Sequence, residues 1–215
     1  MNQAEFRCKW LRLGDIWDYA EVVRNRYWSA GSLPVDVEAI VEFKLKLSID
    51  PEHNLMQKTD MEAYLRSDLT GIVVDHDHYM DEKFANRMRF SFAHELGHFF
   101  LHKDFYALIV FESAEEWKEI LLNLPDTDYR YFEYQANEFA GRLLVPREDL
   151  VQEIEKSVET LKCNNMLEYL KRDPYAVLSG ITPKLARIFG VSSDVIERRV
   201  VREKLWPPDI RETQE

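Results

Sequence analysis

Two histidines four residues apart, with a glutamate directly after the first, are the residues of this sequence best suited to chemistry. They are His94, His98 and Glu95, in the stretch RFSFAHELGHFFLH. In an α-helix, residues four apart lie on the same face, so both imidazoles can bind one metal ion. Glu95 is rotated by about 100° from His94, which places it beside the metal, where a base that activates water belongs. The alternative is an ordinary buried helix with two interior histidines, because the rest of the stretch is apolar.

A third metal ligand is expected downstream, because catalytic zinc normally has three protein ligands and a water. The stretch YFEYQANEFAGRLLVP offers Glu133. Ala136 and Ala140 follow on the same side of the expected helix, and such small residues let two helices approach closely. Asn137 lies one turn beyond Glu133 and can accept a hydrogen bond from the outer nitrogen of a ligand histidine. We therefore predict Glu133 as the third ligand and Asn137 as the residue that holds a ligand histidine in place.

Other histidines near this stretch have different predicted roles. The segment from Asp75 to Glu82 (DHDHYMDE) is a possible second metal cluster, because His76 and His78 would share one face of an extended chain. We favour a polar connection between a strand and the helix, since loops are typically polar. His102 lies one further turn along the helix. One metal ion is not easily reached by three histidines over two turns, so we predict that His102 is a buried hydrogen-bonding residue.

The elements that must position these residues follow from the hydrophobic pattern. Asp81 and Glu82 favour a helix N-terminus, and apolar residues at every fourth position carry this helix to about Lys103. A second helix is expected from about Asp128 to Leu144. The segments LKLSI, AYLRS and TGIVVD are β-branched or alternating, which predicts short strands. The sequence therefore predicts an α+β fold with a small, mainly antiparallel three-stranded sheet packed on helices.

The chain from Pro146 onwards is expected to be entirely helical, which places a boundary between residues 1–147 and a helical C-terminal segment, residues 148–215. The run ITPKLARIFGVSSDVIERRV resembles a helix-turn-helix element. Between Ser179 and Leu205, six Lys or Arg and three Asp or Glu give a local charge of +3. DNA binding is one interpretation, and a helical pair with a structural or protein-binding role is the other. We favour the second, because the whole chain has a net charge of -11 and opposes phosphate binding.

Composition excludes several broad classes of protein. The 215 residues are 46% hydrophobic, which is enough for one good core. The acidic chain as a whole is a poor partner for nucleic acid or an anionic membrane. Two isolated cysteines, Cys8 and Cys163, fit a reducing compartment better than a disulfide framework. No apolar run approaches the roughly 18 residues of a membrane span, and the N-terminus lacks a signal-peptide core, so we expect a cytoplasmic protein without membrane contact.

Two motifs together resemble the ImmA/IrrE family of metallopeptidases. The first is an Arg-Phe-x-x-Ala-His-Glu-x-Gly-His-x-x-x-His run, from Arg89 to His102. The second is Glu-x-x-Ala-Asn-x-Phe-Ala-x-x-Leu-Leu-x-Pro, from Glu133 to Pro146, in which Val145 replaces the more usual Met. Two motifs in the right order are far more specific than the histidine and glutamate pattern alone.

The resemblance implies a zincin-like α+β fold over residues 1–147, with Zn²⁺ held by His94, His98 and Glu133 and with Glu95 as general base. Members of the family commonly act on helix-turn-helix repressor proteins, as antirepressors of mobile elements or in stress responses. Others are paired with toxin-antitoxin-like regulators. We therefore expect an intracellular zinc-dependent endopeptidase that cleaves or inactivates such a repressor or antitoxin.

A second class of function stays open, in which the zinc is structural and the chain is a non-proteolytic regulator that binds protein or DNA. A structural zinc is closed by four protein ligands, whereas a catalytic one keeps a water. Only three predicted ligands converge, and Glu95 has no structural role, which favours the enzyme. A nuclease or phosphatase would need paired acids, which the sequence does not offer at any suggestive spacing. The donor that stabilises the oxyanion stays open among four residues: Tyr131, Tyr134, His76 and His78.

Overall fold

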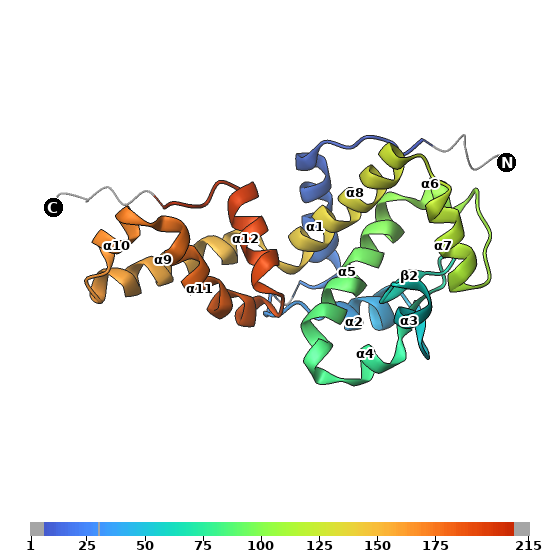
Figure 1. The fold of residues 1–215 in the computed structure, drawn as a ribbon, viewed down its shortest axis with the longest axis horizontal. Coiled ribbons are helices and arrows are strands. Elements are labelled where there is room, and N and C mark those ends of the chain that lie inside the picture. The colour runs from blue at the N-terminus through green and yellow to red at the C-terminus, as the bar shows by residue number, and fades with distance from the viewer. Residues whose placement is uncertain (1–6, 30, 209–215) are drawn as a thin grey trace. The chain divides into compact units, whose positions relative to one another are not determined.

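The computed structural model describes residues 7–29 and 31–208, and the chain divides into two compact units between Leu144 and Val145 (Figure 1). The domain boundary near residue 147 stays a prediction.

Helices make up most of the first unit. In chain order its helical elements are α1 (Leu13–Tyr27), α2 (Val37–Ala39), the π-helix η2 (Ile40–Lys44), α3 (Leu55–Thr59), α4 (His76–Met80), the 3₁₀ turn η3 (Glu82–Phe84), α5 (Ala85–Leu101), α6 (Lys103–Tyr106), α7 (Ala114–Leu122) and α8 (Asp126–Leu144). Together with one small sheet they confirm the α+β class.

The sheet has three strands, in the order β1 (Ser48–Glu52), β3 (Gly71–Asp75), β2 (Ala63–Leu65). β2 pairs with β3 antiparallel, but β1 pairs with β3 parallel, so the sheet is mixed and the expectation of a mainly antiparallel sheet is wrong. A parallel pair needs a crossover of a dozen or more residues, and residues 53–70, which contain α3 and β2, provide it. β2 is an edge strand as a result.

The core of the first unit is built around α5 and α8, which pack against each other, while α1 covers α8 (Figure 1). Phe92 and Leu96 of α5 and Phe139 and Leu143 of α8 are fully buried. Gly97 explains how closely the two helices approach. A Cβ atom there would lie 2.8 Å from the Cα atom of Ala136, so only glycine fits this backbone contact.

The polar segment before α5 is a short helix, α4, rather than an extended connection. Asp75 begins it, and its Oδ1 accepts a hydrogen bond from the backbone N–H of His78 at 2.9 Å. Its other oxygen, Oδ2, accepts from the backbone N–H of Met56 at 2.9 Å. Asp75 therefore caps α4 and fastens α3 to the end of β3. Because Asp81 and Glu82 form part of the turn η3, α5 begins only at Ala85.

The second unit is helical, as expected, with α9 (Arg147–Cys163), α10 (Leu167–Arg172), α11 (Pro174–Phe189) and α12 (Ser193–Arg202). α11 ends at Gly190, whose φ of 62° is the left-handed conformation that glycine favours, and Ser192 caps α12. This is a helix-turn-helix arrangement of the two helices. In the described part of the chain, no helix is long and apolar enough to cross a membrane.

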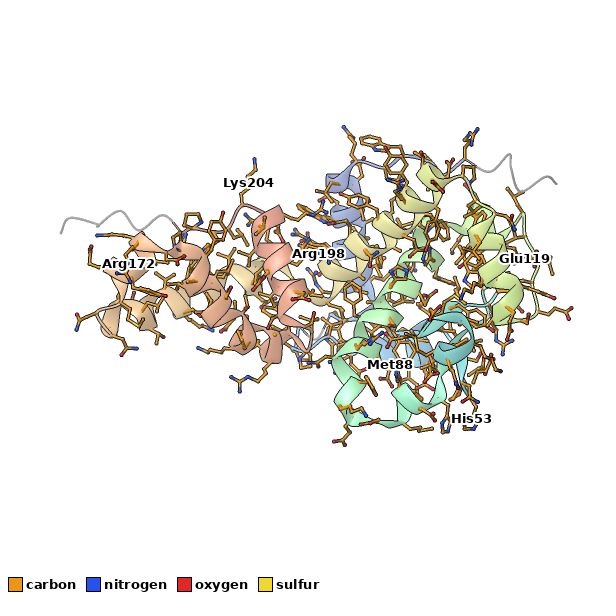
Figure 2. The ribbon with its side chains drawn as sticks, viewed as in Figure 1. His53, Met88, Glu119, Arg172, Arg198 and Lys204 are labelled. Atoms are coloured by element: carbon orange, nitrogen blue, oxygen red, sulfur yellow. The ribbon has the colours of Figure 1, made fainter. Side chains whose placement is uncertain are left out.

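The local positive charge of the second unit is only partly on its surface. Arg199 is buried and forms an ion pair with Glu203, which also pairs with Arg147 at 3.1 Å. Arg198 and Lys204, by contrast, are exposed side chains (Figure 2). Arg199 thus belongs to the interior of the helical pair and not to a phosphate-binding surface.

Candidate metal centre

Three predicted ligand side chains meet between α5 and α8. His94 Nε2 lies 3.3 Å from Glu133 Oε2, and His98 Nε2 lies 3.7 Å from Glu133 Oε1. The two Nε2 atoms are 2.9 Å apart. One donor atom from each residue lies within 4.8 Å of the others, which is close enough for all three to bind one ion. The structure thus brings together the two histidines of one helix and the glutamate of another.

The close approach of α5 and α8 sets this geometry. Gly97 lies between the two histidines on α5, and Ala136 lies three residues after Glu133 on α8. The backbone contact between Gly97 and Ala136 brings the two helix axes near each other at this level of the core. Glu133 follows His98 by 35 residues in the sequence (133 minus 98). Because the two helices are so close, its carboxylate nevertheless reaches both imidazoles.

Asn137 lies where the sequence placed it, next to the first histidine. Its side-chain Nδ2 donates to the Glu133 backbone carbonyl at 2.8 Å, and the side chain also hydrogen-bonds the ring of His94. Burial lowers the pKa of His94, but the hydrogen bond and charge of Glu133 outweigh burial, so this pKa lies above its ordinary value. The supporting role of Asn137 for a metal-bound His94 stays a prediction.

The second histidine is held by a chain of buried polar groups. His98 Nδ1 lies 2.9 Å from His102 Nδ1, and His102 Nε2 lies 3.1 Å from Gln135 Oε1. His102 is therefore the buried hydrogen-bonding residue that the sequence predicted. Burial lowers the pKa of His102 to about 4, so that its ring is neutral at physiological pH. Gln135 was not anticipated, because nothing in its local sequence distinguishes it from a surface residue.

Glu95 borders the three ligand side chains without joining them. The backbone N–H of Leu65, in edge strand β2, donates to Glu95 Oε2 at 2.9 Å. Glu95 is only 6% exposed, and burial raises its pKa to about 8, although the charge of His94 opposes the shift. A carboxylate with one oxygen held and a raised pKa is suited to accept a proton near neutral pH.

A cleft of about 320 Å³ opens over these residues. Its walls come from β2, α5, α7 and α8, and include Ala63, Trp117, Leu121 and Tyr129. Sequence reasoning missed Tyr129, although it precedes Glu133 by one helical turn and so shares its face. The Tyr129 hydroxyl has no hydrogen-bond partner among the residues that the structure describes.

The four residues that the sequence suggested as oxyanion donors are not among the residues that line the cleft. Tyr131 and Tyr134 do not line the cleft. His78 Nδ1 instead bonds Glu62 at 2.8 Å, and His76 bonds its neighbour Asp77 at 3.0 Å.

A smaller polar group lies at the carboxyl end of the parallel strands. Because β1 and β3 pair Glu52 with Asp75, the next residues, His53 and His76, lie side by side with ring centroids 3.9 Å apart. Asp77 completes a group of three possible metal ligands. His53 lies on the surface of the first unit (Figure 2). The polar segment after β3 thus contributes His76 and Asp77 to a second group of possible metal ligands. His78 is not part of this group.

The residues at the main centre fit a divalent metal ion. Two imidazole nitrogens and one carboxylate are a donor set of catalytic zinc, and in the described residues no further His, Cys, Asp or Glu joins the group. The Tyr106 hydroxyl is buried with no hydrogen-bond partner in the described structure, and burial, together with the charges of Glu95 and Glu133, raises its pKa. A buried hydroxyl without a partner is uncommon in a folded protein, and this one lies within the field of the carboxylates of Glu95 and Glu133.

Comparison with solved structures supports the fold. The chain is similar to a structure described as a Mycobacterium tuberculosis transcriptional regulator, with a TM-score of 0.51 and 13% identity over 88% of this chain. The match covers 52% of that protein, so this chain spans about half its length. None of the curated proteins compared with the chain matches it.

The family model described as the IrrE N-terminal-like domain matches residues 78–201. The match includes α5 and α8, which carry the three possible ligands, and continues through most of the second unit. It covers more than half of the 215 residues and confirms the resemblance that the two sequence motifs indicated. The chain belongs to the IrrE N-terminal-like family of metallopeptidase-like domains.

Proposed function

We propose that the protein is a zinc-dependent endopeptidase. The observation that carries the proposal is the convergence of His94, His98 and Glu133 at the floor of an open cleft, with Glu95 beside them. A structural zinc site would be closed by four protein ligands. Three donors and an adjacent carboxylate outside the donor group therefore support a catalytic site over a structural one.

Glu95 is the proposed general base. Bound zinc supplies a Lewis acid and lowers the pKa of a water molecule. Leu65 holds Glu95 Oε2 through its backbone N–H, which leaves Oε1 to take the proton of the attacking water. The same carboxyl group then donates that proton to the leaving nitrogen of the peptide.

Edge strand β2 is the proposed binding site for the peptide backbone. β2 pairs with β3 on one side only, and Leu65 directs its N–H away from β3 toward Glu95. Ala63, two residues earlier, points its backbone groups the same way, because orientation alternates along a strand, and it lines the cleft. An extended substrate can therefore add to this edge by backbone hydrogen bonds, which presents a peptide carbonyl to the metal centre.

Tyr129 is the proposed donor to the oxyanion. Tyr129 lines the same cleft as Glu133, and its hydroxyl has no partner among the described residues. A donor aimed at the developing negative charge stabilises the transition state without reorganisation. Trp117 and Leu121 of α7 form an apolar wall across the same cleft, which suits an apolar side chain of the substrate.

We propose a helix-turn-helix repressor or antitoxin as the substrate, as the resemblance to the ImmA/IrrE family implies. The test is to mix the zinc-loaded protein with the repressor-like product of a neighbouring gene, with and without a chelator. Loss of the intact repressor only when zinc is present supports the proposal. A repressor that stays intact, yet is bound with equal strength with and without zinc, would instead support the non-proteolytic regulator.

A further inference from the structure

A continuous chain of hydrogen bonds joins the N-terminal segment to a proposed metal ligand. It starts at the backbone carbonyl of Lys9, which accepts from Gln135 Nε2 at 2.8 Å. Gln135 Oε1 lies 3.1 Å from His102 Nε2, and His102 Nδ1 lies 2.9 Å from His98 Nδ1. We call these four groups the relay. Gln135, His98 and His102 are all buried.

The Lys9 carbonyl at one end of the relay fixes the direction of every hydrogen bond in it. A backbone carbonyl only accepts, so the amide nitrogen of Gln135 must face Lys9 and its oxygen must face His102. An amide oxygen also only accepts, so His102 carries its hydrogen on Nε2. A neutral imidazole then has its lone pair on Nδ1, and His98 must donate to it from its own Nδ1. The lone pair of His98 is therefore on Nε2, the atom that lies near His94 and Glu133.

We propose that the relay fixes His98 in the tautomer that binds metal through Nε2, with His102 and Gln135 as positioning residues. The inference rests on the proposed metal site. A ligand histidine usually donates its outer N–H to a carboxylate or a carbonyl. Here a second histidine is the acceptor, and it depends in turn on an amide whose orientation is set by the N-terminal segment.

The N-terminal segment is fastened firmly enough for this role. Asp128 Oδ1 accepts from the backbone N–H of Cys8 at 2.7 Å, and Asp128 Oδ2 pairs with Arg7 at 3.2 Å. Asp128 and Gln135 are seven residues apart on α8, which is about two helical turns, so both face the same side. Residues 7–9 are thus attached to α8 at two points, one of which is the start of the relay.

Two substitutions of Gln135 separate the relay from simple packing. Gln135→Met keeps the volume but cannot accept from His102, so zinc affinity, measured by competition with a chromophoric chelator, should fall by about 10- to 100-fold. Gln135→Glu, as the neutral carboxylic acid, still accepts from His102 through its carbonyl oxygen and donates to the Lys9 carbonyl through its O–H. In this protonated form it should bind zinc almost as wild type does. Glu138→Gln is the matched control, because Glu138 is buried on the same helix but bonds Trp17 at 3.1 Å. Its zinc affinity should not change.

The tautomers themselves can be read from ¹⁵N–¹H spectra of the histidine rings in the metal-free protein. The relay requires the hydrogen on Nδ1 of His98 and on Nε2 of His102. The opposite pair of tautomers, or equal zinc affinities of the Met and Glu variants, would overturn the inference. If the wild-type protein binds no zinc, the proposed function fails, and the spectra still decide the relay.

Discussion

At the scale of single residues, Glu95 is the side chain whose removal separates metal binding from catalysis. It lies beside His94, His98 and Glu133 but is not one of the three donors. Glu95→Gln should keep the hydrogen bond from Leu65 and the metal, yet lower peptide cleavage by on the order of 10²-fold or more, because the base is lost. Zinc content by atomic absorption and cleavage of the repressor measure the two effects. Unchanged cleavage would exclude Glu95 as the base.

Tyr129 gives a second prediction at this scale. Tyr129→Phe removes only the hydroxyl, so it should lower kcat by on the order of 10²-fold while KM changes little, since the donor acts in the transition state. The matched control is Tyr131→Phe, because Tyr131 is 38% exposed, as Tyr129 is 39% exposed, but does not line the cleft. Equal rates for both variants would show that the oxyanion donor is another group.

The residues that meet at the candidate metal centre were easier to predict from the sequence than the elements that carry them. Spacing alone places His94 and His98 on one face, and the small residue Ala136 next to Glu133 indicates the close helix contact. Tyr129 could have been found in the same way, from its distance of one turn to Glu133. Gln135 could not, because its partner, the carbonyl of Lys9, lies 126 residues away and no local pattern records it.

At the scale of elements, the contact of α5 with α8 controls the centre. Gly97→Ala gains about 1 kcal/mol in helix propensity, but the new Cβ would lie 2.8 Å from the Cα of Ala136. The backbone cannot yield as a flexible side chain can, so the helices must separate, which should cost about 1–3 kcal/mol net. Urea unfolding measures this cost, and zinc affinity should fall with it because Glu133 moves away from the histidines. Gly180→Ala is the control, since a Cβ at Gly180 meets nothing within 4 Å.

Asp75 gives a prediction that depends on pH. Burial alone would raise the pKa of Asp75, but hydrogen bonds from the backbone N–H groups of Met56 and His78 outweigh burial and lower this pKa. Asp75→Ala should therefore cost about 1–2 kcal/mol of unfolding free energy at neutral pH, as loss of a helix cap does.

The sign of the pH effect follows from the lowered pKa of Asp75. Its contribution is complete above the unfolded-state pKa of about 3.9 and is lost as the pH falls through the lower native value. The difference between wild type and the Ala variant, measured by urea unfolding, should shrink in that acid range. Asp77→Ala, at a side chain that is 73% exposed, serves as the control. A difference that stays constant in acid would contradict the assignment.

The elements themselves were less predictable than the residues they carry. The segments AYLRS and TGIVVD contain β2 and β3, but β1 begins only at Ser48, so LKLSI shares just its last two residues with the observed strand. Side-chain alternation also has the same period in parallel and antiparallel pairs. It could not show that β1 runs parallel to β3. The segment after β3 was expected to be a connection, because five residues are too few for a helical period to be visible. Only the capping hydrogen bond of Asp75 explains why it is helical.

At the scale of the whole molecule, metal binding should stabilise the first unit, because all three donors belong to it. A ligand that binds only the native state at 1,000 times its Kd adds about 4 kcal/mol. A chelator should therefore lower the melting temperature and speed amide exchange in α5 and α8. The His94→Ala variant should show no such response to chelator. A wild-type protein with the same melting temperature with and without zinc would argue against a site formed by the folded chain.

The attachment of residues 7–9 to Asp128 also affects the reactivity of the Cys8 thiol. Burial, followed by the charge of Asp128, raises the pKa of Cys8 to about 11. A cysteine reacts with oxidants and alkylating agents as the thiolate, and Cys8 is almost entirely the thiol at neutral pH. We therefore expect Cys8 to react only slowly with peroxide, so that oxidation should not disturb the attachment of residues 7–9 to α8.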